Sequence, residues 1–382
     1  MSLRIAVIAH CRHPIAAPFM GGMEAHAHHL CHALAARGHE VTLVAAGDSQ
    51  VGVAQMPMME AHYDRDFPWH CFHGTDALNA HLDLCHAEAL HGIMGAGFDV
   101  IHNNSLHRFP PRLARAARLP MVSSMHVPPF DALRRAIRDS VAPWHCVTGC
   151  STRHLRAYFP DALPGSAHVV PNGIDVAEWP FRPEGDGSAV WAGRITPNKA
   201  PHLALQAAGR AGIDLTLFGA IEDGDYFRDH IRTQLRGGLH YGGHLPAREL
   251  AAEYGRASAL LFTPQWDEPF GLTAIEAMAC GTPVAAIRMG AVDEVVGPAG
   301  RYAAADGTGL DRALIEAMQI PRSLPRARVE AHFTLDRMIE GYTRFYRRAI
   351  AARDTPKPDI RYPEIELPAM LWSPAPLSAA GR

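Results

Sequence analysis

The stretch from Thr263 to Val284, T-P-Q-W-D-E-P-F-G-L-T-A-I-E-A-M-A-C-G-T-P-V, constrains the fold of this chain more than any other. Apolar residues up to Phe262 predict a strand, and a Pro/Gly turn leads from it into a short helix from about Leu272 to Cys280. The first amides of such a helix have no partner inside the helix and point to where an anion can bind. The sequence therefore predicts a phosphate site at the amides of Phe270, Gly271, Leu272 and Thr273.

Two carboxylates flank this predicted phosphate site. Glu268 comes just before the helix, and Glu276 lies eight residues later, about one turn inside it. A carboxylate repels a phosphate, so we expect both to accept hydrogen bonds from neutral donors such as sugar hydroxyls. The pattern predicts a ligand in which a sugar is joined to a phosphate.

The same residues carry a family resemblance. The string E-P-F-G-L-x-x-x-E-A-M-A-C-G-T-P-V resembles the E-x7-E signature of the family 4 retaining glycosyltransferases. The resemblance implies an α/β fold of two Rossmann-like, doubly wound lobes that face each other across a cleft, the B-type fold. It also implies transfer of a sugar from a UDP- or GDP-sugar donor. On the residues alone, an amphipathic helix that follows a turn is the alternative.

Length and composition fit a two-domain protein without a dominant electric field. The chain has 382 residues, enough for two cores, and 36 basic against 39 acidic residues give a formal net charge of −3. Nothing in that balance favours a nucleic-acid partner. We see no signal-peptide pattern and no apolar run long enough for a membrane span, and the seven scattered cysteines suit a reducing compartment. We therefore expect a cytoplasmic protein.

Strand and helix patterns alternate along the chain, which predicts two parallel sheets. We expect residues 1–172 to form an acceptor-binding Rossmann-like domain and residues 173–353 to form the nucleotide-sugar donor-binding domain. A helix from Thr334 to Arg353 closes the second lobe or packs back on the first. Residues 354–382 are rich in proline and are expected to form an extended or disordered tail.

Two further segments carry groups that suit phosphates. Gly21 and Gly22 precede a predicted helix and let the backbone approach a ligand closely. Arg194 and Lys199 lie on one loop, A-G-R-I-T-P-N-K-A, and lysine occurs only twice in the chain. Two nearby cations suit a diphosphate, although a solvated turn is the alternative. The loop looks like the family's G-R-x-x-x-x-K-G segment, in which the arginine and lysine hold the diphosphate, with Ala200 where glycine is usual.

Three polar residues end predicted strands of the first domain, where ligands of doubly wound sheets bind. His126 ends one strand, and Asn103 and Asn104 end its neighbour and could contact an acceptor hydroxyl. A single histidine is more often structural, but the resemblance implies that His126 contacts the donor sugar and is catalytic. In the second domain, the Gly219 loop, F-G-A-I-E-D-G, should lie near the nucleotide base. It departs from the family's usual G-x-G, so the identity of the nucleotide base stays open.

A histidine-rich helix and an arginine-rich surface have simpler explanations. The cluster around His28 and His32 lacks a carboxylate to complete a metal site, so we expect no metal and no other cofactor. Arginines between 112 and 138 give the first domain a basic face. A solvated surface is the simplest explanation, and peripheral membrane contact or binding of an anionic acceptor are the alternatives. The M-G-A-V-D-E-V-V run at 289–296 resembles the family's G-G-x-x-E-x-V segment.

Taken with the resemblance, these observations predict a metal-independent hexosyltransferase that acts on a carbohydrate, lipid-linked or small-molecule acceptor. Retention of the anomeric configuration is what the resemblance implies. The resemblance assigns catalytic roles to Glu268, Arg194 and Lys199. An epimerase or hydrolase of the same fold, or a non-catalytic nucleotide-sugar binding subunit, is the alternative. A Rossmann dehydrogenase is disfavoured because the G-x-G-x-x-G fingerprint is missing.

Overall fold

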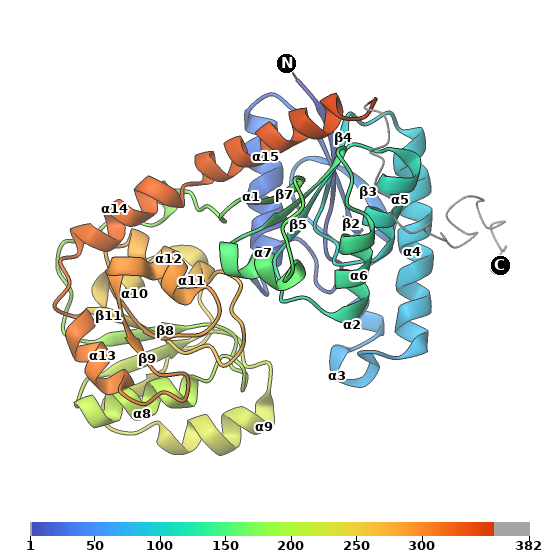
Figure 1. The fold of residues 1–382 in the computed structure, drawn as a ribbon. Helices are drawn as coiled ribbons and strands as arrows, with labels where there is room; N and C mark the ends of the chain where they lie inside the picture. The colour runs from blue at the N-terminus through green and yellow to red at the C-terminus, as the bar shows by residue number, and fades with distance from the viewer. Residues whose placement is uncertain (1, 355–382) are drawn as a thin grey trace. The chain divides into compact units, whose positions relative to one another are not determined.

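The computed structural model describes residues 2–354, and these divide into two compact units (Figure 1). The first unit contains residues 2–149, 155–170 and 339–354, and the second contains Cys150–His154 and Pro171–Met338. The predicted proline-rich tail lies outside the described residues, apart from residue 354. Each unit is built on one parallel sheet.

The first unit has a seven-stranded sheet in the order β3-β2-β1-β4-β5-β6-β7. Every neighbouring pair is parallel. The central strands are buried along their whole length, as expected for a parallel sheet that is covered on both faces. The strands are β1 (Arg4–Ile8), β2 (Glu40–Ala46), β3 (Ala54–Met59), β4 (Val100–Asn103), β5 (Met121–Met125), β6 (His145–Gly149) and β7 (Ala167–Val169).

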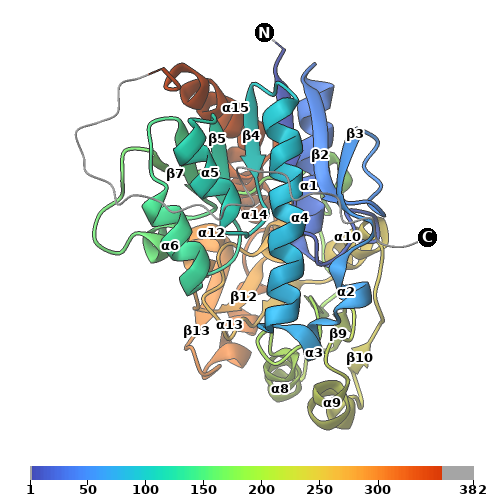
Figure 2. The same cartoon turned by 90° about the vertical axis from the view of Figure 1, so that its right-hand side faces the viewer.

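Helices cover both faces of this sheet. Ile8, Ile101 and Met121 share a core with side chains of α4 and α5, which lie in front of the strands in Figure 2. On α15, Tyr346 reaches His102 of β4, so the C-terminal part of that helix packs on the first sheet. The helices are α1 (Gly22–Ala36), α2 (Tyr63–Asp66), α3 (Trp69–Phe72), α4 (Asp76–Gly95), α5 (Phe109–Ala117), α6 (Asp131–Asp139), α7 (Thr152–Tyr158) and α15 (Leu335–Ala351). The first residues of α7 and α15 belong to the second unit.

The second unit has a six-stranded parallel sheet in the order β10-β9-β8-β11-β12-β13. Side chains alternate along β11: Leu260 and Phe262 pack with α10 to α12 and α14, while Ala259 and Leu261 pack with α8 and α13. The strands are β8 (Ala189–Ala192), β9 (Leu215–Phe218), β10 (Leu239–Tyr241), β11 (Ala259–Phe262), β12 (Val284–Ile287) and β13 (Gly300–Ala303). The helices are α8 (Pro201–Ala211), α9 (Gly224–Tyr226), α10 (Ala247–Arg256), α11 (Leu272–Ala279), α12 (Val292–Val296), α13 (Leu310–Ala317) and α14 (Ser323–His332). Short helical turns are η1 (Val176–Glu178), η2 (Phe227–Ile231), η3 (Arg232–Gln234) and η4 (Gly297–Ala299).

The predicted α/β fold with two doubly wound parallel sheets is confirmed. Several elements, among them β3, β13 and α5, have no apolar pattern from which we predicted them. β3 is largely exposed and contains Pro57, so it lacks the apolar run of an inner strand. α5 has prolines in its first turn, where a missing amide hydrogen costs nothing, and we had assigned no helix to that segment.

Candidate active site

The strand order of the second sheet determines where its functional loops meet. β8 and β11 are neighbours in the middle of the sheet. The chain continues from β8 to β9 and β10 on one side, and from β11 to β12 and β13 on the other. Ligands of open α/β sheets bind at the carboxyl ends of such a pair. The loop after β8 carries Arg194 and Lys199, and the loop after β11 carries Glu268 and the start of α11. The fold therefore brings these predicted donor residues to one edge of one sheet.

The N-terminus of α11 presents unpaired backbone donors. Gly271 precedes the helix with φ of 96°, and a Cβ at this position would lie 3.0 Å from the Phe262 ring. No side chain caps the helix. Within residues 2–354, none of the amides from Phe270 to Thr273 donates a hydrogen bond to a protein acceptor. The turn thus keeps these four amides available to an anion.

Lys199, Glu268 and Trp266 form a compact cluster beside this helix end. The Lys199 ammonium donates to Glu268 Oε2 at 2.6 Å, and the Trp266 indole donates to the same oxygen at 2.8 Å. The ammonium also lies 4.8 Å from the centroid of the Trp266 ring. The side chains of Lys199 and Glu268 are only 20% and 8% exposed. We had expected neutral hydroxyls as partners of Glu268, but in this structure its carboxylate is paired with a lysine.

The backbone of Glu268 is held by the segment that follows β12. Ala291 donates its amide to the Glu268 carbonyl at 2.8 Å. Gly290 has φ of 59°, and a Cβ there would lie 2.2 Å from the Glu268 nitrogen, so only glycine fits. This is the segment that resembled the family's G-G-x-x-E-x-V motif, and its glycine and following amide fix the Glu268 loop. Sequence reasoning assigned it no role.

Arg194 is also paired with a carboxylate. Its guanidinium donates to Glu222 Oε2 at 2.6 Å, and Glu222 lies on the loop after β9 that we expected near the base. Gly219 begins this loop with φ of 139°, and a Cβ there would lie 1.8 Å from the Gly193 carbonyl oxygen. Gly219 therefore lets the loops after β8 and β9 touch, which places Glu222 next to Arg194. Sequence reasoning did not identify Glu222 as a functional candidate.

Ala200 has a left-handed backbone, with φ of 48°, directly before α8. This conformation costs an L-residue about 1–2 kcal/mol, and glycine adopts it freely. The structure thus gives the reason for the family's usual glycine at this position. It also shows that alanine keeps the turn that carries Lys199.

Glu276 differs from Glu268 in its surroundings. Burial of its carboxyl raises the pKa of Glu276 to about 7; Glu178 adds to the rise and the Tyr254 hydroxyl offsets part of it. Within the described part of the chain, no arginine or lysine pairs with this carboxyl group. The charge of Glu276 therefore changes near neutral pH.

In the first unit, His126 belongs to a buried polar network. Its Nε2 lies 3.0 Å from Ser124 Oγ, and its ring centroid lies 4.1 Å from that of His26. Ser124 Oγ in turn lies 2.9 Å from His102 Nε2, whose Nδ1 lies 2.7 Å from the Tyr346 hydroxyl. Burial lowers the pKa of both His26 and His102 to about 3, so both rings are neutral. Sequence reasoning missed His102 and Tyr346 because the partners are far apart in the chain.

Asn104 belongs to this network, and Asn103 belongs to a neighbouring group of buried serines. Asn103 donates to Ser123 Oγ at 3.1 Å and accepts from Ser105, and Asn104 accepts through its carbonyl oxygen from Ser124. The two residues are 1% and 2% exposed. The structure thus uses both side chains in internal hydrogen bonds, and their role as acceptor ligands stays a prediction.

Gly21 directly precedes α1, as predicted, whereas Gly22 is the first residue of the helix. Gly21 is the N-cap residue with extended backbone, and α1 begins at Gly22 without a side-chain cap. A Cβ on Gly21 would lie 3.1 Å from Glu24 Oε2.

Among residues 2–354, no group of three or more His, Cys, Asp and Glu side chains is placed to hold a metal. The histidines of α1 form ring contacts with one another.

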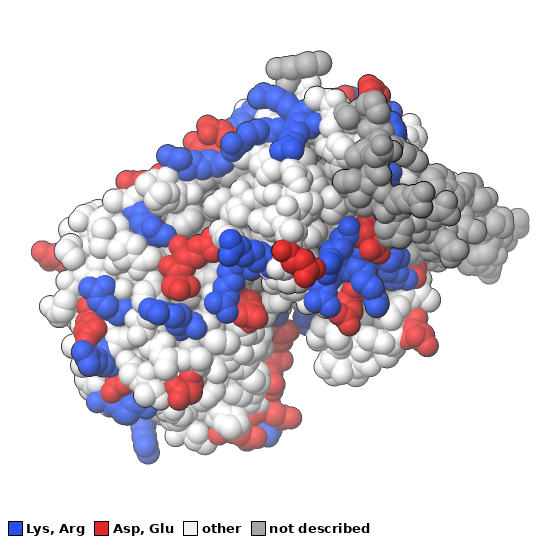
Figure 3. Space-filling view, viewed as in Figure 1, with Lys and Arg blue, Asp and Glu red and all other residues white. Residues whose placement is uncertain are grey.

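The predicted basic face of the first unit is partly neutralised. Arg134 pairs with Asp131 and Arg138 with Asp161, each at 3.0 Å, and Arg115 donates to a backbone carbonyl. On the face seen in Figure 3, basic and acidic side chains are interspersed. None of the described helices is long and apolar enough to cross a bilayer.

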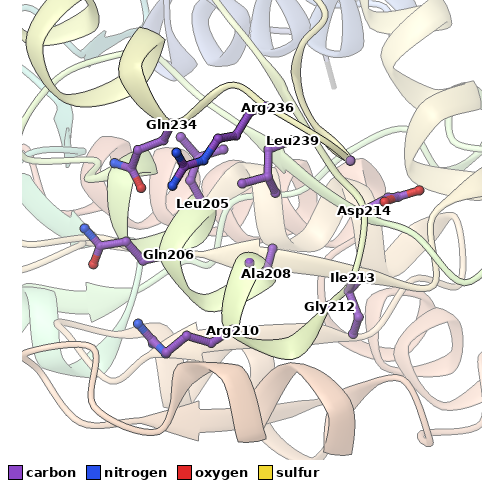
Figure 4. A pocket seen from close by; sticks show the side chains of 12 residues that line it. Leu205, Gln206, Ala208, Arg210, Gly212, Ile213, Asp214, Gln234, Arg236 and Leu239 are labelled. Atoms are coloured by element: carbon purple, nitrogen blue, oxygen red, sulfur yellow. The ribbon is translucent and has the colours of Figure 1, made fainter.

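A surface depression of about 610 Å³ lies away from these groups (Figure 4). Its lining includes Arg210 at the end of α8, Asp214 just before β9, and Leu239 at the start of β10. It therefore lies at the amino ends of these strands, the edge opposite the loops after β8 and β11. None of the predicted site residues lines it.

Comparison with known proteins identifies the family. A model of "Glycosyltransferase Family 4" matches residues 20–178, and one of "Glycosyl transferases group 1" matches residues 179–328. The chain belongs to the family 4 glycosyltransferases. This glycosyltransferase is 28% identical over 400 aligned residues to glycogen synthase of Mycobacterium tuberculosis, covering 91% of this chain and 96% of that protein. It is 32% identical over 219 residues to a D-inositol 3-phosphate glycosyltransferase of Geodermatophilus obscurus, covering 48% of each.

Solved structures confirm the B-type fold of this glycosyltransferase. Sucrose-phosphate synthase of Thermosynechococcus elongatus has a TM-score of 0.73 at 21% identity, over 92% of this chain and 100% of that one. Anabaena Alr3699/HepE in complex with UDP-glucose has a TM-score of 0.68 at 16% identity, over 90% and 98%. The predicted family, fold and enzyme class are thus confirmed, and the enzyme uses a nucleotide-sugar donor.

Proposed function

We propose that this glycosyltransferase moves a hexosyl group from a UDP- or GDP-sugar to an acceptor hydroxyl, with retention of anomeric configuration and without a divalent metal. The observation that carries the proposal is the uncapped N-terminus of α11 next to the Lys199–Glu268 pair. Backbone amides and a cation suit a diphosphate, and a neighbouring carboxylate suits the hydroxyls of a sugar joined to it.

Each group has a role in this proposal. The α11 amides, Arg194 and Lys199 hold the diphosphate, Glu268 accepts from hydroxyls of the transferred sugar, and Glu276 accepts from the ribose. Lys199 exchanges its carboxylate partner for the diphosphate when the donor binds. The positive groups then stabilise the charge that develops on the leaving nucleotide as the glycosidic bond breaks. The departing phosphate takes the acceptor proton, which is consistent with a sequence that shows no dedicated nucleophile.

The electrostatics of this site support metal independence. A helix N-terminus, a guanidinium and an ammonium supply the positive charge that a divalent ion supplies elsewhere. The nearest D-x-D pair, Asp223 and Asp225, is used otherwise: Asp223 caps α9 through the Tyr226 amide at 2.8 Å, and Asp225 pairs with Arg228 at 2.7 Å. We expect turnover to persist in excess EDTA, and loss of activity that Mg²⁺ or Mn²⁺ restores would contradict this part of the proposal.

We assign acceptor binding to the first unit, with His126 facing the transferred sugar and Asn103 and Asn104 as candidate acceptor contacts. The names of two relatives suggest acceptors to test first, glycogen and D-inositol 3-phosphate. Peripheral membrane contact through the arginines of α5 and α6, and with it a lipid-linked acceptor, is the third possibility to assay.

The deciding experiment has two stages. Thermal-shift measurements with UDP-, GDP- and ADP-sugars identify the donor, since a ligand that binds only the folded protein raises the melting temperature. Release of nucleotide is then measured with and without each acceptor, and NMR of the product gives the anomeric configuration. Turnover that needs no acceptor would indicate an epimerase or hydrolase, and binding without any turnover would indicate a non-catalytic subunit. Retained configuration in an acceptor-dependent product supports the proposal.

A further inference from the structure

We propose that Trp266 is a positioning residue that holds Glu268 in place while Lys199 leaves it for the donor diphosphate. The inference rests on the proposed function and adds a residue to it. Trp266 contacts both partners of the ion pair: its indole N–H donates to Glu268 Oε2 at 2.8 Å, and its ring lies 4.8 Å from the Lys199 ammonium.

The hydrogen bonds of Glu268 show what the tryptophan does. The ammonium and the indole both donate to Oε2, and among residues 2–354 no group donates to Oε1. When the ammonium turns to a diphosphate, the indole N–H is the contact left to fix the carboxylate. A buried carboxylate that keeps one charge-assisted hydrogen bond stays oriented toward the hydroxyls it has to accept.

The ring face serves the lysine in the same exchange. An indole ring attracts an ammonium that lies over its face, and this attraction needs no carboxylate partner. Lys199 therefore keeps a favourable contact while it exchanges Glu268 for the diphosphate. The Trp266 side chain thus contacts Glu268 with its N–H edge and Lys199 with its ring face. Phenylalanine retains the face and loses the N–H, which makes it the informative substitution.

The loop around Trp266 does not depend on this indole. Gln265 donates its amide to the Asn198 carbonyl at 2.8 Å, and Thr263 Oγ1 donates to the Lys199 carbonyl at 2.8 Å. The loops after β8 and β11 are therefore joined by their own hydrogen bonds. We expect Trp266→Phe to fold with a melting temperature close to that of the wild type.

The test measures activity and fluorescence of the full-length enzyme with UDP-, GDP- and ADP-glucose. Trp266→Phe should lower kcat about tenfold, the effect of losing one hydrogen bond to a charged group, with donor KM within about threefold. Donor binding should change the tryptophan emission of the wild type, and this change should be lost in Trp266→Phe. The matched control is Trp69→Phe in the first unit, where a ring also lies under a cation, Arg12, at 4.7 Å. That variant should keep both kcat and the emission change.

A double-mutant cycle separates positioning from general loop support. If Trp266 acts through Glu268, Trp266→Phe should cause little further loss in a Glu268→Ala background, whereas a full additional tenfold loss would overturn the proposal. Wild-type kcat or an intact emission change in Trp266→Phe would also overturn it. If none of the three sugar nucleotides shifts the melting temperature of the wild type, the proposed function itself fails, and this inference fails with it.

Discussion

Lys199→Ala is the most informative single substitution, because it removes the ammonium that we assign to the diphosphate. Deleting one preorganised charge-stabilising donor raises the barrier by about 3 kcal/mol, which corresponds to a roughly 160-fold loss in kcat. The same change leaves the Glu268 carboxylate, 8% exposed, with a hydrogen bond from the indole N–H of Trp266. Because Lys199 itself is 20% exposed, we expect a stability loss of about 2 kcal/mol, below that of a fully buried pair.

The assay is nucleotide release at saturating donor and acceptor, with the melting temperature of each variant measured alongside. Arg210→Ala serves as the matched control, since Arg210 is a cation on the helix after Lys199 and pairs with Asp311 at 3.7 Å near the opposite edge of the sheet. The control should keep wild-type kcat. Lys199→Ala that turns over at the wild-type rate would remove Lys199 from the mechanism, and a folded variant with a kcat loss below tenfold would refute the magnitude.

Three further predictions concern the other charges of the second unit. The pKa of Glu276 in the folded protein is about 7, above its ordinary 4.5. The free energy of unfolding should therefore contain the full contribution of this group below pH 4.5, and it should fall by up to about 3 kcal/mol as the pH rises to 7. Thermal melts of Glu276→Gln should lose this pH dependence. Because ionised Glu276 is proposed to accept from the ribose, the donor affinity of the wild type should rise as the pH increases through 7, and that of Glu276→Gln should not. Glu222→Gln should release Arg194 and tighten nucleotide binding up to about fivefold by calorimetry, since a partly exposed ion pair is worth under about 1 kcal/mol; weaker binding would show that Glu222 positions the guanidinium. Arg322→Met should destabilise the protein by about 2–4 kcal/mol in urea melts, because its guanidinium donates to the carbonyls of Gly255 and Ala257 and to other buried acceptors; kcat should stay unchanged.

The parts of this enzyme that could be predicted from sequence are those set by local pattern. The strand–turn–helix at Leu272 and the loop of Lys199 follow from apolar runs, glycines and prolines that lie close together in the chain. Glu222 was missed because its partner Arg194 follows a different strand, and only the strand order brings the loops after β8 and β9 together. His102 was missed for the same reason, since its Tyr346 partner lies 244 residues away.

The pairing of both cations with carboxylates has a consequence for how the site selects its ligand. A diphosphate that draws Lys199 away leaves Glu268 short of a donor, which is unfavourable for a carboxylate with so little exposure. Hydroxyls of a sugar attached to that diphosphate can supply the missing donors, whereas a free nucleotide or pyrophosphate cannot. The ion pair therefore opposes binding of the diphosphate alone more strongly than binding of the whole donor. By this reasoning, Glu268 contributes to selectivity before any chemistry occurs, because the group that recognises the sugar is also the group that the phosphate-binding lysine has to leave.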